Sequence, residues 1–132
     1  MIVLDASVLA VVVGDDAHDG PVARARLAAE GAAAVPDLAD VETVSVLRRR
    51  WRAGDLTDVR FRDAVDDLLR LPLDRYPVGR LMMRAFELRH NVTPYDACYI
   101  ALAEGLGCVL LTADARLSRA PGIACRVEVF AP

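Results

Sequence analysis

Four acidic residues stand at positions where a carboxylate could do chemistry, although they are spread over the chain. Asp5 directly follows the apolar stretch MIVL, and Asp114 lies two residues beyond the apolar stretch CVLLT. Asp96 lies among small and apolar neighbours in TPYDACYIALAE, and Glu42 lies early in DLADVETVSVLRRRW. Carboxylates held within a few ångström of one another repel and do not all stay ionised unaided. A site shared by these four acids would therefore need a cation.

A hard divalent cation suits such a cluster. Carboxylate oxygens without His or Cys favour Mg²⁺ or Mn²⁺, which keep several waters and often bind substrate phosphates. One or two such ions activate water and stabilise the leaving oxygen of a phosphodiester. His18 and His90 are the only histidines and are far apart in the sequence, so they indicate no metal site of their own. The acids therefore predict a Mg²⁺ or Mn²⁺ site.

Each acid also has a purely structural explanation. Asp96 follows a Thr-Pro-Tyr segment that is typical of a helix start, where an acid favours the helix dipole. Asp5 and Asp114 could each cap the helix that follows them. Glu42 could lie on an ordinary solvated helix face, since Arg49 and Arg52 near the end of that helix favour its dipole. Both explanations stay open from the residues alone.

The elements that carry the acids alternate along the whole chain. Apolar stretches that read as short strands are separated by helical patterns, and no repeat or low-complexity segment interrupts them. Such alternation indicates crossover units, and therefore a mainly parallel sheet of four to five strands with helices on both faces. Ligands bind outside the carboxyl ends of the strands in such sheets, where Asp5 and Asp114 would lie. The predicted strands are MIVLD, AAAVP, LPLDRY, CVLLT and CRVEVF.

Helical patterns fill the segments between these strands. Thr57 is predicted to cap one helix, and Pro77 is predicted to open another that reaches about Arg89. The helix that carries Asp96 is expected to stop at Gly107, because glycine favours the residue after a helix end. Three further helices are predicted in SVLAVVV, GPVARARLAAEG and DLADVETVSVLRRRWRA.

Length and composition limit the class of protein. The chain has 132 residues, of which 55% are hydrophobic, so a single domain with a real core is expected. No apolar run approaches the roughly 18 residues of a membrane helix, and the apolar N-terminus lacks the positive leader of a signal peptide. Three cysteines without C-x-x-C spacing, Cys98, Cys108 and Cys125, indicate free thiols in a reducing compartment. A cytoplasmic protein without a membrane partner is expected.

Charge and residue usage exclude several activities. The net charge is only −3, which argues against a wholly basic surface for nucleic acid but allows a local basic patch. The sixteen basic residues are all Arg, so Schiff-base chemistry and the lysine of a P-loop are excluded. Serine hydrolysis lacks a G-x-S-x-G elbow and a suitable His.

Four motifs, in this order, resemble the successive acidic motifs of PIN-domain proteins: MIVLDAS, VETVSVLRR, TPYDACYIALAE and LLTADARLSR. The resemblance spans nearly the whole chain, and the compact length is similar to that of VapC-type toxins of bacterial toxin–antitoxin pairs. It implies a single three-layer α/β/α domain over residues 1–132. It also implies a metal-dependent endoribonuclease that acts on RNA, a homodimer, and an antitoxin protein that blocks the site.

The resemblance also implies roles for single residues. Asp5, Glu42, Asp96 and Asp114 would hold the metal and carry catalysis. Ser7 and Thr112 would be supporting hydroxyls. Because the flank of the helix that carries Glu42 leads away toward two arginines, we further predict that Arg49 and Arg52 contact the RNA backbone.

Two other kinds of protein compete with this reading. A phosphoacceptor receiver is also a doubly wound domain, but it pairs two acids after its first strand and uses a Lys near its last, and this chain has neither feature. A PIN scaffold without catalysis, acting through protein contacts, is closer, although all four acids are present.

Overall fold

A parallel sheet of five strands forms the centre of the protein. The computed structural model describes residues 1–131, so the end of the predicted domain at 132 lies outside the described residues. The strands lie in the order β3-β2-β1-β4-β5, and each neighbouring pair is parallel, which confirms the expected mainly parallel sheet. They are β1 (Ile2–Leu4), β2 (Ala33–Pro36), β3 (Leu73–Tyr76), β4 (Val109–Thr112) and β5 (Val127–Val129).

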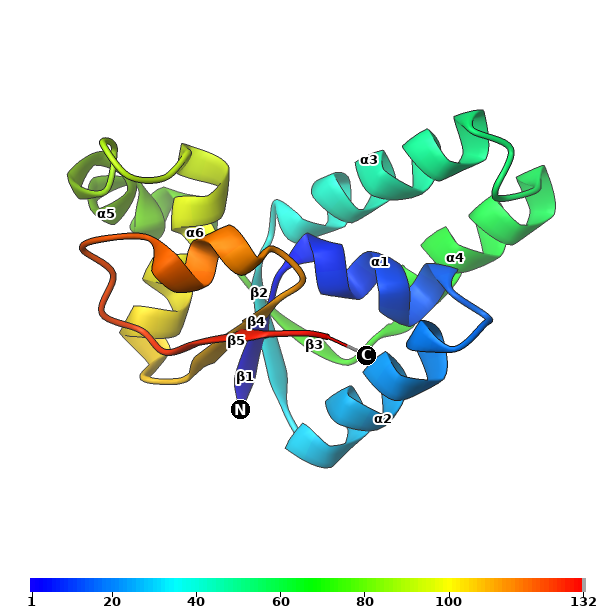
Figure 1. Cartoon of the computed structure of the whole chain (residues 1–132), viewed down its shortest axis with the longest axis horizontal. Coiled ribbons are helices and arrows are strands. Elements are labelled where there is room, and N and C mark those ends of the chain that lie inside the picture. Colours follow the sequence, from blue (N-terminus) through cyan, green and yellow to red (C-terminus); the bar gives the residue numbers. More distant parts are fainter. Residues whose placement is uncertain (132) are drawn as a thin grey trace.

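Helices cover both faces of this sheet. Figure 1 shows the sheet nearly edge-on, with α1 to α4 on one side and α5 and α6 on the other. The three-layer α/β/α architecture is therefore confirmed. The helices are α1 (Ala6–Gly14), α2 (Asp19–Glu30), α3 (Ala39–Arg52), α4 (Asp58–Arg70), α5 (Met82–Glu87) and α6 (Pro94–Leu106), with short 3₁₀ helices η1 (Val78–Leu81) and η2 (Ala115–Arg119).

Most helix boundaries follow local signals in the sequence. Thr57 caps α4, since its side chain accepts a hydrogen bond from the Arg60 amide, 3.0 Å away. Gly107 ends α6 with a φ of 64°, a left-handed conformation that favours glycine. Both boundaries agree with the prediction.

The segment predicted as one helix from Pro77 to about Arg89 is helical and ends close to the predicted residue, but its first turn is of another type. Its first turn is the 3₁₀ helix η1, and α5 ends at Glu87. Gly79 lies in that first turn and lowers the helix propensity there. At the other end the guanidinium of Arg89 donates to the carbonyl oxygen of Phe86 at 3.0 Å, which satisfies a helix-end carbonyl.

The hydrophobic core lies on both sides of β1 and β4. It fixes the positions of the strand ends that carry Asp5 and Asp114. All three residues of β1 are buried, as are seven consecutive residues of α6 from Ala97 to Ala103. Full burial of one large apolar side chain contributes about 1.5–3 kcal/mol. The ends of β1 and α6 are therefore firmly positioned. Among the described residues, no helix combines the length and the apolar character needed to cross a membrane.

Candidate functional site

The ends of β1 and β4 bring Asp5 and Asp114 to one edge of the sheet. The two strands are parallel neighbours, with Leu4 paired to Leu111, and the Asp5 amide donates to the Leu111 carbonyl at 3.0 Å. Because parallel strands end at the same edge, the segments that follow β1 and β4 lie side by side. The expectation that both residues follow strand ends at one edge is confirmed.

Two hydroxyl groups hold the carboxylate of Asp5. The hydroxyls of Ser7 and Thr112 both donate to Asp5 Oδ2, at 2.9 and 2.6 Å. The same hydroxyls accept the backbone amides of Ala113 and Asp114, each at 3.0 Å. Asp5 makes no side-chain capping bond to α1, so the capping explanation does not describe its side chain. The hydroxyls orient Asp5 and attach to it the segment that carries Asp114.

Glu42 is partly withdrawn from water at the start of α3. The phenol of Tyr99, which is only 1% exposed, donates to Glu42 Oε1 at 2.7 Å. Burial raises the pKa of the Glu42 carboxyl, the Tyr99 hydrogen bond partly opposes this, and the charges of Asp5 and Asp96 raise the pKa further. The alternative of an ordinary solvated helix face is therefore wrong for Glu42.

Asp96 lies in the first turn of α6 and faces other acids. Thr93 caps the helix, because its hydroxyl accepts the Asp96 amide at 3.2 Å. The purely structural explanation, a capped helix start, is thus correct for the backbone amide of Asp96. Burial nevertheless raises the pKa of the Asp96 carboxyl, and the charges of Asp5 and Asp114 raise it further, which Arg116 and Thr93 offset only in part.

Asp114 has an arginine partner of its own. Its carboxylate caps η2 by accepting the Arg116 amide at 2.9 Å, and the Arg116 guanidinium donates to both carboxylate oxygens at 2.7 to 3.2 Å. These hydrogen bonds lower the pKa of Asp114. The capping explanation is therefore confirmed for Asp114. The charge of Asp114 nevertheless also raises the pKa of Asp96. Arg116 is 83% exposed, so the ion pair is open to water.

The donor set fits a divalent cation held by few protein ligands. Within residues 1–131, no three His, Cys, Asp or Glu side chains lie close enough to form a ready metal cluster. Mg²⁺ is commonly held by one or two carboxylates together with waters and substrate phosphates, and it does not require a protein cage. Burial and neighbouring carboxylates raise the pKa values of Glu42 and Asp96, so a bound cation would relieve the repulsion on these two groups. The chemistry of the residues therefore fits Mg²⁺ or Mn²⁺.

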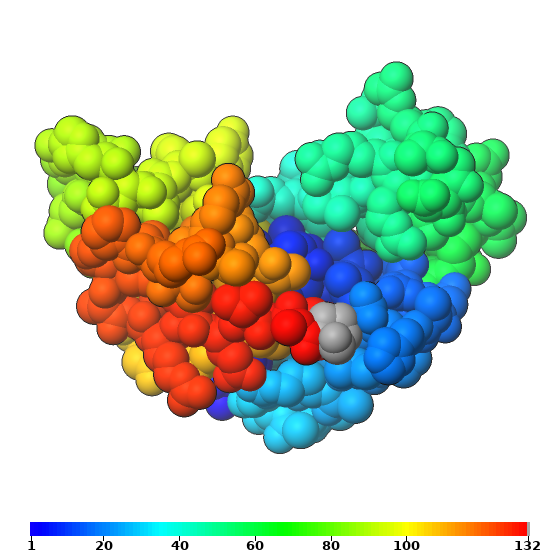
Figure 2. All heavy atoms as spheres, viewed as in Figure 1, coloured from blue at the N-terminus to red at the C-terminus, as the bar shows by residue number. Residues whose placement is uncertain are grey.

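A hollow opens in the surface near this edge of the sheet (Figure 2). Figure 2 shows this hollow between the part of the chain that carries α5 and the start of α6 and the part that carries α3 and α4. Residues of the N-terminal segment, in blue, and of the segment after β4, in orange, lie at its floor. The hollow leaves this edge of the sheet open to solvent (Figure 2).

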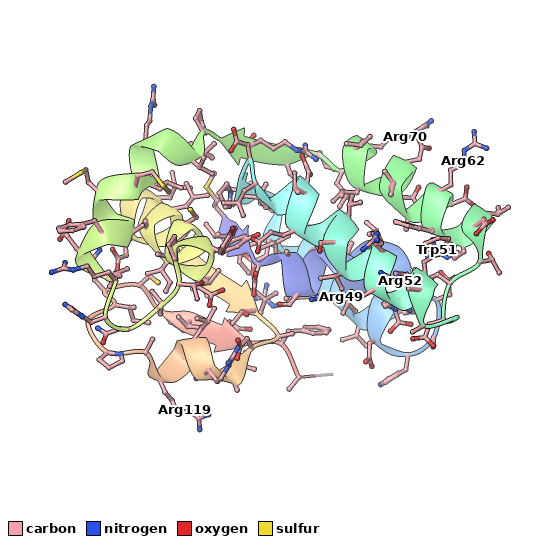
Figure 3. The ribbon with its side chains drawn as sticks, turned by 90° about the horizontal axis from the view of Figure 1, so that it is seen from above. Arg49, Trp51, Arg52, Arg62, Arg70 and Arg119 are labelled. Atoms are coloured by element: carbon pink, nitrogen blue, oxygen red, sulfur yellow. The ribbon has the colours of Figure 1, made fainter. Side chains whose placement is uncertain are left out.

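Arg49 and Arg52 lie away from this floor. Both are exposed on α3, at about 10 and 15 Å from Glu42 along the helix axis, at about 1.5 Å per residue. Figure 3 shows them along the outer part of α3.

Two residues at the site escaped the sequence analysis. Tyr99 lies three residues after Asp96 and thus on the same face of α6, which is a signal that could have suggested it. Arg116 lies two residues after Asp114, but spacing alone does not pair two side chains.

Comparison with known proteins agrees with this fold and arrangement. The family model described as PIN domain matches residues 2–123. The chain belongs to the PIN-domain family. The matched segment of this PIN-domain protein includes all four acids. VapC ribonuclease Mb0985 of Mycobacterium bovis is 42% identical to it over 129 residues, which are 98% of each chain. The relative places the protein among VapC-type members of the family.

Solved structures share the fold of this PIN-domain protein at lower identity. The VapBC2 structure from Rickettsia felis, bound to a DNA fragment from its promoter, matches with a TM-score of 0.68 and 15% identity, over 99% of this chain and all of that one. Mycobacterium tuberculosis VapC20, described as a toxin that cleaves the sarcin-ricin loop, matches with a TM-score of 0.66 and 21% identity, over 94% and 97% of the chains. At these identities the likeness concerns the fold alone.

Proposed function

We propose that this PIN-domain protein is a metal-dependent endoribonuclease and the toxin of a toxin–antitoxin pair. The observation that supports the proposal is that acids from four separate segments lie near enough to act on one another: the charges of Asp5 and Asp96 raise the pKa of Glu42, and those of Asp5 and Asp114 raise the pKa of Asp96. The Asp5 carboxylate is held by two hydroxyl donors. The names of the relatives, a VapC ribonuclease and an RNA-cleaving toxin, support the same activity.

Each residue of the proposed site has a physical role. The four acids would hold Mg²⁺ or Mn²⁺, and Ser7 and Thr112 would keep the Asp5 carboxylate in one orientation. Tyr99 does the same for Glu42 through its hydrogen bond. When bound, the ion would lower the pKa of water and stabilise charge on the departing oxygen. Water would add to phosphorus as the bond to the 3′ oxygen breaks, which leaves a 5′ phosphate and a 3′ hydroxyl.

Purified protein incubated with structured RNA tests this function. Cleavage is expected with Mg²⁺ or Mn²⁺ and is expected to stop when EDTA removes the metal. Mapping of the product ends is expected to find 5′ phosphates and 3′ hydroxyls. Cleavage that survives EDTA, or that leaves the cyclic phosphate formed when the 2′ hydroxyl attacks, would contradict the mechanism.

Arg49 and Arg52 are proposed to contact the RNA backbone beyond Glu42. Both are exposed, and neither forms an ion pair within the described part of the chain, so both are available to phosphates. Replacing both by Ala is expected to weaken RNA binding and to flatten its salt dependence, while the fold keeps its thermal stability. Titrations of labelled RNA at several salt concentrations measure this. An unchanged affinity and slope would mean that these arginines serve only as a solvated helix end.

Protein partners are proposed for the outer helices. The VapBC2 complex suggests an antitoxin partner, and α4 and α5 expose apolar side chains that an antitoxin segment or a second copy could cover. The large exposed apolar residues on α4 and α5 are Val59, Leu69, Met82, Met83 and Phe86. We propose a homodimer, which light scattering at micromolar concentration would refute if it found a strict monomer.

The unpaired thiols favour the cytoplasm, which cell fractionation would test.

A further inference from the structure

A second hollow continues from the acidic site on the side of α6 and η2. It is a groove of about 620 Å³, and both Asp96 and Asp114 belong to its lining. One wall is the segment 89–94 that leads into α6, and the other is η2 with the turn after it. Whatever occupies the site at the acids can therefore continue into this groove.

The two walls are tied together. The side-chain amide of Asn91 donates to the Pro121 carbonyl at 2.9 Å, which joins the segment before α6 to the turn after η2. The guanidinium of Arg84 donates to the Gly122 carbonyl, also at 2.9 Å, and pairs with Glu104 on α6. Gly122 has a φ of 81° and leaves room for the Asn91 side chain, which would lie 3.3 Å from a Cβ there. The groove is thus built into the fold.

The charge of this groove differs from that of the whole chain. Its only acids are Asp96 and Asp114, the two proposed metal ligands, whereas its basic residues are Arg89, His90, Arg116 and Arg119. By contrast, the groove over α3 and α4 has two arginines and three aspartates. The net charge of the whole chain is −3, so this local excess of arginine cannot be inferred from the overall charge. A groove that is basic beyond the acids suits a polyanion.

Arg89 and Arg119 are available to bind this polyanion, although Nη1 of Arg89 also donates to the Phe86 carbonyl at 3.0 Å. Both are exposed, and neither forms an ion pair within residues 1–131. The Arg89 guanidinium lies 4.2 Å from the centre of the Phe86 ring, so one of its faces is oriented by an aromatic contact. Arg119 extends away from the body of the protein in Figure 3. Arg116, in contrast, is engaged by Asp114.

We propose that this groove binds the phosphate backbone of single-stranded RNA that continues from the cleaved bond, with Arg89 and Arg119 as phosphate contacts on opposite walls. The inference rests on the proposed function and adds the direction in which the strand leaves the acids. A single strand suits a basic groove that follows the backbone, because its phosphates can enter between two walls. An acidic protein segment would bring carboxylates next to Asp96 and Asp114, which disfavours it.

RNA binding by a full-length chain that carries Asp5→Asn, and so does not cleave, tests the proposal. A labelled single-stranded RNA is titrated with this protein in Mg²⁺ at several salt concentrations. Adding Arg89→Ala and Arg119→Ala is expected to lower the affinity about 100-fold, since each of the two lost hydrogen bonds to a charged group contributes on the order of a tenfold change. The slope of log K against log salt is expected to become less negative by ~1.4, at ~0.7 for each contact to a single strand.

A matched double variant controls for the loss of charge. Arg62 and Arg80 are also exposed and form no ion pair within the described chain, and both lie outside this groove. Arg62→Ala with Arg80→Ala is expected to keep the affinity and the salt slope. Arg89→Lys with Arg119→Lys is expected to keep most of the slope, because the charges remain.

The outcomes separate the two proposals. Suppose that the Asp5→Asn chain binds RNA, and that adding Arg89→Ala and Arg119→Ala gives the same affinity and salt slope as adding Arg62→Ala and Arg80→Ala. The groove proposal is then overturned, while the nuclease proposal stands. If the wild-type chain does not cleave RNA and the Asp5→Asn chain does not bind it, the proposed function fails and the groove proposal fails with it.

Discussion

Replacing Asp96 by Asn is expected to lower RNA cleavage by at least ~100-fold, a typical loss when a group that stabilises transition-state charge is removed. The same substitution is expected to raise the melting temperature of the protein in EDTA. At neutral pH the Asp96 carboxylate is half-buried near the charges of Asp5 and Asp114, and the neutral amide removes that repulsion. A gain in stability with a loss of activity would separate a functional role from misfolding.

The pH dependence of this stability gain has a definite sign. The pKa of Asp96 is raised in the folded protein above its ordinary value of 3.8. Its contribution to stability is therefore fully present below the unfolded pKa and is lost as the pH rises through the folded pKa. The gain from Asp96→Asn should thus be largest at neutral pH and should disappear below about pH 3.8. Added Mg²⁺ should stabilise the wild type more than the variant.

Asp37 provides a matched control. It directly follows β2 at the same edge of the sheet, but its side chain is exposed, and its charge is not among those that raise the pKa of Glu42 or Asp96. Asp37→Asn is expected to keep cleavage and the response to Mg²⁺, whereas Asp5→Asn is expected to lose both. Equal cleavage by the wild type and Asp96→Asn would remove Asp96 from the site.

Replacing Thr112 by Val is expected to cost about 2 kcal/mol of unfolding free energy, because a hydrogen bond to a buried charged group is lost. Thr112 is fully buried, its hydroxyl donates to Asp5, and it accepts the Asp114 amide. Valine has nearly the same shape but leaves both groups without this partner. The expected fall in melting temperature is about 8 °C for a chain of this size.

Thr43→Val is the matched control for this substitution. Thr43 is also fully buried, but its hydroxyl has no hydrogen-bond partner within the described residues. Its replacement by Val is therefore expected to be neutral or stabilising. Thr112→Ser, which keeps the hydroxyl, is expected to retain more stability than Thr112→Val. Thermal unfolding of the three variants measures this, and equal melting temperatures for the two Val variants would show that the Thr112 hydroxyl does not hold Asp5.

Local patterns in the sequence were sufficient for the architecture. Apolar stretches that alternate with helical patterns predicted a parallel sheet, because only crossover connections join such strands. Thr57 and Thr93 marked helix starts, since a side chain that accepts the first amides acts over a few residues. The positions of Asp5 and Asp114 at one edge followed from the same pattern, because all strands of a parallel sheet end on the same side.

Only the tertiary structure decided what each acid contacts. Glu42 meets Tyr99 across 57 positions of the sequence, and Asp5 meets Thr112 across 107. Such pairs depend on how α3, α6 and the strands pack, and spacing along one element does not encode that packing. The groove beside Asp96 likewise depends on the contact between Asn91 and Pro121, because it exists only where two separate segments are tied together. The sequence by itself thus determined the elements and the edge at which the acids lie, whereas packing decided their partners.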